Sequence, residues 1–235
     1  MSSERIQLYL TAEHECSYLP DRMASNIVPD PDLPMDMSIY SLFIKLGYRR
    51  SGDFIYQPHC QNCKECKACR IPVAKFSPRK NQQRCLKSNH DLNLSMVKAH
   101  YSDEYFELYQ AYLNARHTDG EMSNPSRNDF EHFLYSTWSN TYFIEVRKDG
   151  RLLAVAVTDV TPAGLSAVYT FFDPTESKRG LGNFCILQQI RQAQYMQLEH
   201  LYMGYWIKDC QKMKYKACFQ PMEFFIDDIW QPKHQ

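Results

Sequence analysis

Residues 142–172 read YFIEVRKDGRLLAVAVTDVTPAGLSAVYTFF. Three runs in this stretch are rich in apolar, aromatic and β-branched residues, which favour strands. The runs cover residues 142–146, 152–160 and 165–172. The short segments KDG and PAG separate them, and glycine or proline at such places favours a tight reversal of the chain. The stretch therefore predicts a meander of three antiparallel strands.

Helical patterns lie on both sides of the meander. Ser102 is placed to cap one helix, and a second helix begins near residues 124–125. After the meander, a helix begins near Gly182 and is followed by a strand, a short helix and a final strand near residues 219–226. This order is the one expected of the N-acetyltransferase-like (GNAT) fold, whose mixed sheet splays after its central strand. We therefore expect an α+β (mixed α/β) protein.

The first 95 residues show a different pattern. Three prolines among several aspartates indicate an extended loop over residues 21–36. Residues 37–46 have apolar side chains at helical spacing, and Gly47 is placed to end that helix. We expect two domains, a smaller cysteine-rich N-terminal domain over residues 1–95 and a GNAT-like domain over residues 96–235.

The N-terminal part contains a run of four cysteines with two-residue spacers, Cys60, Cys63, Cys66 and Cys69. A C-x-x-C pair can bring two thiolates to one metal ion. The run predicts a zinc site or an iron–sulfur cluster, since thiolates suit both. Cys16 is the candidate additional ligand, because four thiolates at this spacing are crowded around one ion. The alternative is a set of buried thiols.

Composition narrows the function classes. The chain has 235 residues, 44% of them hydrophobic, and a formal net charge of zero. A globally basic nucleic-acid-binding protein is not indicated, although a local basic patch is compatible with this balance. The first ten residues resemble no signal peptide, and no apolar run is long enough to span a membrane. We expect a cytoplasmic protein with reduced cysteines and no membrane partner.

Two segments of the C-terminal part are candidate binding elements. Lys178, Arg179, Gly180 and Gly182 lie in a turn between a strand and a helix, where backbone N–H groups can bind an anion. An ordinary turn is the alternative. Residues 201–216 contain several aromatic residues followed by lysines, which form either a core strand with a solvated helix or one edge of a binding cleft.

Several motifs together resemble the arginyl-tRNA–protein transferase family, and more closely its bacterial branch of aspartate/glutamate leucyltransferases. The motifs are CSYLP at 16–20, GYRRSG at 47–52, the cysteine run leading into RIPV at 70–73, YTFFDP at 169–174, GYWI at 204–207, and MKYKACFQPME at 213–223. The eukaryotic relatives begin with a C-x-x-C pair, whereas only Cys16 is present at the matching place here.

The resemblance implies an aminoacyltransferase. Leucine would pass from leucyl-tRNA to the α-amine of proteins that begin with Asp or Glu, which marks them as N-degrons for proteolysis. An aminoacyl ester is already activated, so the chemistry requires positioning and proton transfer and no cofactor. The rival functions are an acetyl-CoA-dependent GNAT N-acetyltransferase and a non-enzymatic zinc-knuckle adaptor.

The resemblance also suggests roles for individual residues, each with an ordinary surface or core residue as the alternative. Arginine can distinguish the acceptor's carboxylate from an amide by bidentate pairing. Aromatic rings can stack on the 3′ end of the tRNA. The candidates are Arg49, Arg50 and Arg84 for the acceptor; Tyr169, Tyr205 and Trp206 for stacking; Lys178, Arg179 and Lys216 for phosphates; and Tyr215 or Glu223 for proton transfer.

Overall fold

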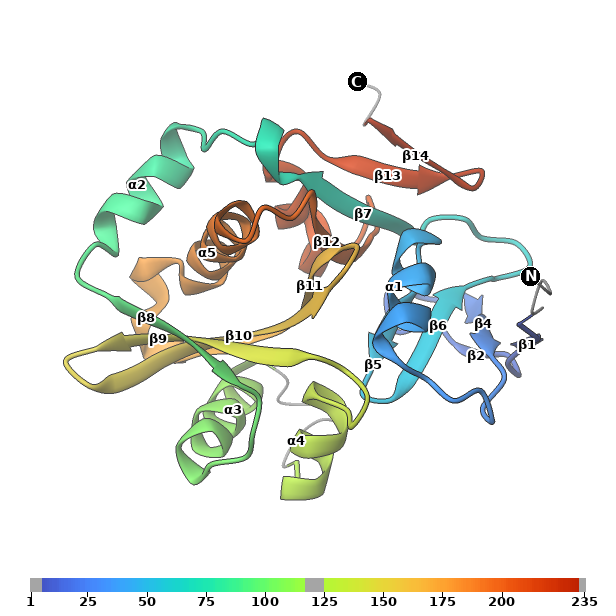
Figure 1. Ribbon diagram of the computed structural model, residues 1–235, viewed down its shortest axis with the longest axis horizontal. Helices are drawn as coiled ribbons and strands as arrows, with labels where there is room; N and C mark the ends of the chain where they lie inside the picture. Colours follow the sequence, from blue (N-terminus) through green and yellow to red (C-terminus); the bar gives the residue numbers. More distant parts are fainter. Residues whose placement is uncertain (1–5, 117–124, 233–235) are drawn as a thin grey trace.

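An eight-stranded mixed sheet forms the centre of the protein in the computed structural model, which describes residues 6–116 and 125–232 (Figure 1). Its strands run in the order β14-β13-β7-β12-β11-β10-β9-β8. They are β7 (Lys67–Pro72), β8 (Asn93–Lys98), β9 (Thr141–Lys148), β10 (Arg151–Thr161), β11 (Gly164–Phe172), β12 (His200–Trp206), β13 (Glu223–Ile226) and β14 (Ile229–Pro232). The mixed α/β class is therefore confirmed.

The N-terminal residues build smaller sheets beside the large one. A four-stranded sheet has the order β1-β4-β6-β5, and β2 pairs with β3. These strands are β1 (Leu8–Leu10), β2 (His14–Glu15), β3 (Met23–Ala24), β4 (Asn26–Pro29), β5 (Arg49–Ser51) and β6 (Phe54–Pro58). The helices and 3₁₀ segments are α1 (Met37–Lys45), η1 (Val73–Lys75), α2 (Lys80–Ser88), α3 (Asp103–Arg116), α4 (Arg127–Leu134), η2 (Pro174–Arg179), α5 (Leu181–Tyr195) and η3 (Gln211–Cys218).

The predicted meander is confirmed. β10 pairs antiparallel with both β9 and β11. Helices cover both faces of these strands: α3 and α4 pack on one face, and α5 packs on the other (Figure 1). The side chains of residues 152–157 are accordingly buried on both faces. Burial of both faces explains why this strand reads as a continuous apolar run without alternation.

β11 and β12 separate after a short parallel pairing. Among the described residues, they pair only at Leu165 with Leu201 and at Ser166 with Tyr202. β12 then shifts its register against β7 between Tyr202 and Tyr205, and Gly204 takes a left-handed conformation with φ of 68°. A residue with a side chain is strained in that conformation. The two strands therefore diverge where β12 bulges, and a gap opens beside Gly204.

The large sheet takes strands from both parts of the chain. β7, which carries the last cysteine of the run, lies between β12 and β13. The predicted boundary between residues 95 and 96 falls within β8. The division into two domains stays a prediction, but the large sheet includes strands from both sides of that boundary.

Several elements differ from the sequence-based expectation. The extended loop predicted over residues 21–36 contains the strands β3 and β4. Residues 80–88 form helix α2, although this segment reads only as basic and polar, because its buried side chain is the polar Gln82. The strand predicted near residues 219–226 begins at Glu223, because η3 continues to Cys218 and the Phe219 ring packs in the core against Phe76. It is not the last strand, because β14 follows it. The start of the predicted second helix at residue 124 lies outside the described residues.

Candidate active site

A group of tyrosines and cations gathers where β11 and β12 diverge. Arg49 on β5 lies against Gly204, with its Nη1 atom 3.0 Å from the position that a Cβ atom would take there. A small cavity at this place is lined by residues of α1, β5, β7, β11, β12 and β14. Its lining includes Arg49, Cys69, Ser166, Tyr202, Gly204 and Trp230. Five different strands and one helix thus converge on the bulge in β12.

Arg49 carries a charge that no described carboxylate pairs with. Its Nη2 donates to the Val168 carbonyl at 2.6 Å. Burial acts to lower the pKa of Arg49, but the phenolates that neighbouring tyrosines become at high pH act to raise it, and the net direction is upward. These tyrosines are Tyr18, Tyr56, Tyr205 and Tyr215. A cation surrounded by neutral phenols is a site where a substrate anion gains strong pairing.

Lys216 is buried and does not reach the surface, which corrects its predicted role in phosphate contact. Only 6% of the residue is exposed. Its Nζ donates to the carbonyls of Met203 at 2.7 Å and Tyr205 at 2.6 Å. Burial lowers the pKa of Lys216 to about 8. These bonds flank Gly204, so Lys216 holds the bulge of β12 in place.

Tyr215, from η3, is the predicted proton-transfer residue that the structure places beside Arg49. The residue is 43% exposed, and its hydroxyl lies in the field of Arg49 and Arg116. Desolvation raises the pKa of Tyr215 to about 12. The hydroxyl is therefore protonated at neutral pH, where it can donate a hydrogen bond but is a poor base.

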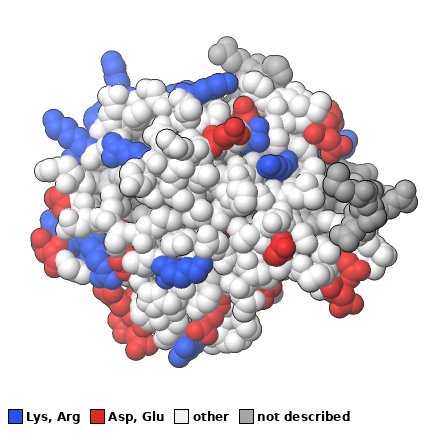
Figure 2. All heavy atoms as spheres, in the orientation of Figure 1, with Lys and Arg blue, Asp and Glu red and all other residues white. Residues whose placement is uncertain are grey.

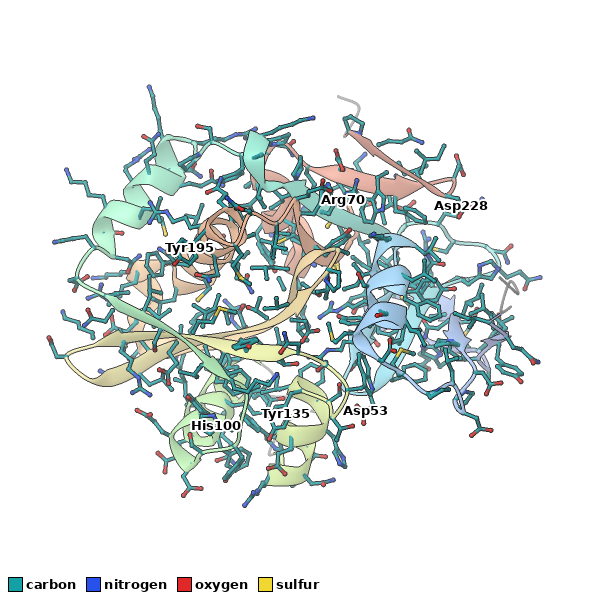
Figure 3. All side chains as sticks on the ribbon, viewed as in Figure 1. Asp53, Arg70, His100, Tyr135, Tyr195 and Asp228 are labelled. Atoms are coloured by element: carbon teal, nitrogen blue, oxygen red, sulfur yellow. The ribbon has the colours of Figure 1, made fainter. Side chains whose placement is uncertain are left out.

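Glu223, the other candidate for proton transfer, is committed to an ion pair. Its Oε2 accepts from Arg70 Nε at 2.7 Å. Arg70 lies on β7 next to β13 (Figure 3) and stacks on the Trp230 ring at 4.4 Å. Its Nη1 donates to the Tyr202 hydroxyl at 3.5 Å. Arg70 thus links Glu223 to Tyr202 and Trp230, two residues that line the cavity.

The aromatic candidates occupy different places. Tyr169 lies edge-on to Phe133 at 5.0 Å and to Tyr112 at 6.3 Å, within the group around Arg49. The Tyr205 hydroxyl donates to the carbonyls of Gly47 and Tyr56 at 3.1 and 2.9 Å, which fixes the ring beneath β6. Trp206 packs on the core residue Phe224 at 5.2 Å. Tyr169 is partly exposed, but it is not among the residues that line the small cavity.

Arg50 does not read the acceptor, which corrects that prediction. Its side chain is fully buried, and Nε and Nη2 donate to the two carboxylate oxygens of Asp159 at 2.6 and 2.7 Å. The same guanidinium also donates to Thr141 and to two backbone carbonyls. The fork therefore joins β5 to β10 and has no contact with solvent.

Arg84 lies on the exposed side of α2, and its predicted contact with the acceptor stays a prediction. The turn before α5 is also partly used by the fold. Arg179 donates to Asp91 at 2.9 and 3.0 Å and to Glu176 at 3.0 Å. Lys178 is exposed. Of the two predicted phosphate contacts in this turn, Lys178 alone has no described ion pair.

Each of the two glycines in that turn is explained by the local structure. Gly180 is the N-cap of α5 and takes a left-handed conformation with φ of 63°. Gly182 faces the Phe172 ring, which lies 3.3 Å from the position of an added Cβ atom. A predicted anion site at this turn stays a prediction.

Four of the five cysteines of the predicted metal site lie near one another, since, besides burial, Cys16, Cys60 and Cys63 all act to raise the pKa of Cys66. Cys69 is buried in β7 and donates its thiol to the Gly204 carbonyl at 3.4 Å. Cys63 accepts from Arg22 at 3.2 Å. Burial raises the pKa of Cys66 to about 12, with the nearby Cys60 and Cys16 acting in the same direction. Among the residues that the structure describes, no three His, Cys, Asp or Glu side chains are arranged to hold a metal. The zinc or iron–sulfur site therefore stays a prediction.

Four residues near Arg49 or Tyr215 were not expected from the sequence. Tyr18 and Tyr56 lie close to the Arg49 guanidinium, and Tyr112 and Arg116 come from the end of α3. Arg116 lies over the rings of Tyr112 and Phe172 at 5.4 and 5.2 Å. Tyr18 belongs to the CSYLP motif, which could have identified it, whereas Tyr112 reads as part of an ordinary apolar helix stripe.

Membrane insertion has no support among the described helices, since none is long and apolar enough to cross a bilayer.

Comparison with known proteins gives matches along almost the whole chain. The family described as arginine-tRNA-protein transferase matches through its C-terminal part at residues 104–226 and through its N-terminal part at residues 14–84. The aspartate/glutamate leucyltransferases of Pseudomonas fluorescens strains SBW25 and Pf0-1 are each 51% identical over 226 residues. That of Pseudomonas putida strain GB-1 is 48% identical, and each match covers 96% of both chains.

Two solved structures are similar at low sequence identity. The C-terminal domain of a putative lysylphosphatidylglycerol synthetase from Agrobacterium fabrum matches with a TM-score of 0.48 and 14% identity, over 73% of this chain and 52% of that one. L-PGS from Bacillus licheniformis matches with a TM-score of 0.47 and 10% identity, over 72% and 50%. With two family matches and relatives of 48% to 51% identity, the chain belongs to the arginine-tRNA-protein transferase family.

Proposed function

We propose that this protein transfers leucine from leucyl-tRNA to the free α-amine of proteins that begin with Asp or Glu. The observation that carries the proposal is Arg49, a cation without a described carboxylate partner at the point where β11 and β12 diverge. The family membership supports the reaction type, and the leucyltransferase relatives support leucine as the donor residue.

The geometry of the sheet suits a GNAT-like acyl transfer. The gap between two diverging parallel strands can admit an extended acyl donor beside an amine acceptor. Lys216 and Cys69 bind the three successive carbonyls of Met203, Gly204 and Tyr205. Because these carbonyls are satisfied by side chains, the bulge keeps its shape although β12 is no longer paired with β11 there. We infer that the leucyl ester lies along this gap.

Arg49 recognises the acceptor in this proposal. A carboxylate can accept two hydrogen bonds from the guanidinium fork, while an amide offers one acceptor and no charge. An N-terminal Asp or Glu therefore binds beside Gly204 more strongly than Asn or Gln. The bond from Arg49 to the Val168 carbonyl fixes the fork before the substrate arrives, which lowers the entropic cost of binding.

The cations of the site also favour leucine over arginine as the transferred residue. Arg49 and Arg116 lie in the same group of tyrosines, and no described carboxylate pairs with either of them. A cationic arginyl side chain would be repelled there, whereas an apolar leucyl side chain can pack on the rings of Tyr112 and Tyr169.

The reaction needs few catalytic groups. The amine nitrogen attacks the ester carbonyl, a peptide bond forms, the ester C–O bond to the ribose breaks, and the ribose oxygen takes a proton while the amine loses one. Because Tyr215 is protonated at neutral pH, we assign it a donor role toward the developing oxyanion or the leaving oxygen. Positioning supplies most of the remaining acceleration, and the ester requires no cofactor for activation.

A transfer assay tests the proposed function. A peptide beginning with Asp is incubated with the protein and, separately, with leucyl-tRNA, arginyl-tRNA or acetyl-CoA, and its mass is measured; peptides beginning with Asn and with acetylated Asp are the controls. Leucine added to the Asp peptide from leucyl-tRNA alone supports the proposal. Added arginine overturns the choice of donor, an added acetyl group favours an acetyltransferase, and binding without turnover favours an adaptor.

A further inference from the structure

One segment of the chain is basic without any acidic residue. From residue 67 to residue 90 the sequence contains no Asp or Glu, but it contains Lys67, Arg70, Lys75, Arg79, Lys80, Arg84 and Lys87. The whole chain has 27 basic and 27 acidic residues. The charges are therefore segregated locally although they cancel overall, and segregation of this kind creates a positive surface field.

The cations of this segment lie on one side of α2. Lys80, Arg84 and Lys87 are spaced so that they share a helix face, which extends roughly 10 Å along the axis. All three are exposed, as are Arg79 and Lys75, whereas the opposite face carries the buried Gln82. In Figure 2 the Lys and Arg side chains project at the upper left, where Figure 1 shows α2.

These cations form no ion pair within the described part of the chain, whereas several arginines elsewhere do. Arg127 pairs with Glu131, Arg147 with Glu104 and Arg151 with Asp173. By contrast, none of the exposed cations of α2 or the segment before it has an ion pair. Like charges at helical neighbours, and cations at the start of a helix, weaken α2. Binding of a polyanion would relieve both effects.

α2 is joined to the segment that carries Tyr215 and Lys216. Gln82 Nε2 donates to the Cys218 carbonyl, the last residue of η3, at 3.2 Å. At the other end of the helix, Asn89 Nδ2 donates to the Arg179 carbonyl at 2.8 Å, next to the exposed Lys178. The basic face thus extends from the cleft segment to the turn before α5. A ligand whose end enters the cleft has this face beside it.

We propose that the exposed face of α2, formed by Lys80, Arg84 and Lys87, binds the sugar–phosphate backbone of the donor tRNA next to its aminoacylated end. The inference rests on the proposed function for the identity of the polyanion. α2 contains no aromatic residue, so it offers no surface for base stacking and suits the phosphates of a double-helical acceptor arm. It contributes affinity and orientation but does not read the tRNA sequence.

The test compares two triple variants with the same change in charge. The first is Lys80→Gln, Arg84→Gln and Lys87→Gln; glutamine keeps helix propensity close to that of lysine and arginine. The control is Lys45→Gln, Lys98→Gln and Arg127→Gln, three exposed cations on α1, β8 and α4. The readouts are the Kd for uncharged tRNA as a function of salt, and KM and kcat for leucyl-tRNA and for the Asp peptide. Unchanged circular dichroism and Tm verify the fold of both variants.

We expect the α2 variant to raise the tRNA Kd and the leucyl-tRNA KM on the order of tenfold or more, and to reduce the salt slope by about 1 for each lost phosphate contact. Its kcat and its KM for the peptide stay unchanged, and the control variant behaves as the wild type. A short leucyl ester of the 3′-terminal nucleotides, without a double-helical arm, is used equally by wild type and α2 variant.

Other outcomes overturn the inference. If the α2 variant has the tRNA affinity and salt slope of the wild type, this face is not the docking surface. The proposed function still stands in that case, provided that the protein transfers leucine from leucyl-tRNA. Loss of binding to anionic vesicles or to an acidic peptide, with tRNA binding unchanged, assigns the face to another partner. If the wild type binds tRNA through α2 but transfers no leucine, the proposed function fails and the docking surface stands.

Discussion

Replacement of Arg49 by methionine should remove the discrimination between acidic and amide N-termini. Methionine keeps much of the side-chain length but has neither charge nor donors. A hydrogen bond to a charged group contributes about 1.5–3 kcal/mol. The preference for Asp over Asn, measured as the ratio of kcat/KM values, should therefore fall roughly 10- to 150-fold. The structure gives the reason: Arg49 lies at the bulge of β12 with no described carboxylate to use its charge.

The assay uses peptides that differ only in their first residue, Asp, Glu, Asn or Gln, at saturating leucyl-tRNA. Arg49→Lys is the matched variant, because it keeps the charge but loses the planar fork. We expect it to retain part of the preference for Asp. Loss of the bond to the Val168 carbonyl destabilises both variants, so thermal unfolding of each must be measured as well.

The reasoning would be refuted by a folded Arg49→Met protein whose preference for Asp over Asn equals that of the wild type. A general loss of activity toward all four peptides would also contradict it, because that result assigns Arg49 to the donor or to the fold.

Three further predictions concern neighbouring residues. Arg50→Met should destabilise the fold by about 3–5 kcal/mol, measured by urea unfolding, because it leaves Asp159 buried without its partner; a loss of selectivity without a loss of stability would contradict this. Burial depresses the pKa of Lys216 from 10.5 to about 8, so the folded state binds fewer protons than the unfolded state between these pH values. The free energy of unfolding of the wild type, relative to that of Lys216→Met, should therefore rise as the pH increases from about 8 to 10.5. A difference between the two proteins that does not change with pH would count against this prediction. Tyr215→Phe should lower kcat about 10²- to 10³-fold with the acceptor KM nearly unchanged, and an unaltered kcat would remove Tyr215 from the chemistry.

The local sequence pattern was sufficient to predict the secondary structure at the centre of the fold. The meander over residues 142–172 and the helices that became α1, α3 and α5 follow from runs of apolar residues and from glycines or a capping serine at their ends. The order of these elements and the motifs along the chain also indicated the transferase family. These features depend on neighbours in the sequence, so no tertiary contact is needed to read them. The sequence did not predict helix α2, because its buried side chain is polar and a polar residue adds nothing to a helical hydrophobic pattern.

The roles of the charged residues were decided by tertiary contacts alone. Arg49 and Arg50 are adjacent in β5, and a strand points successive side chains to opposite faces. The sequence determined that the two arginines differ in direction, but not which one would meet Asp159, a residue 109 positions away. In the same way, Lys216 reads as a surface charge until β12 surrounds it. Burial and pairing are properties of residues brought together from distant parts of the chain, and for that reason the free cation of the site could be identified only in the folded structure.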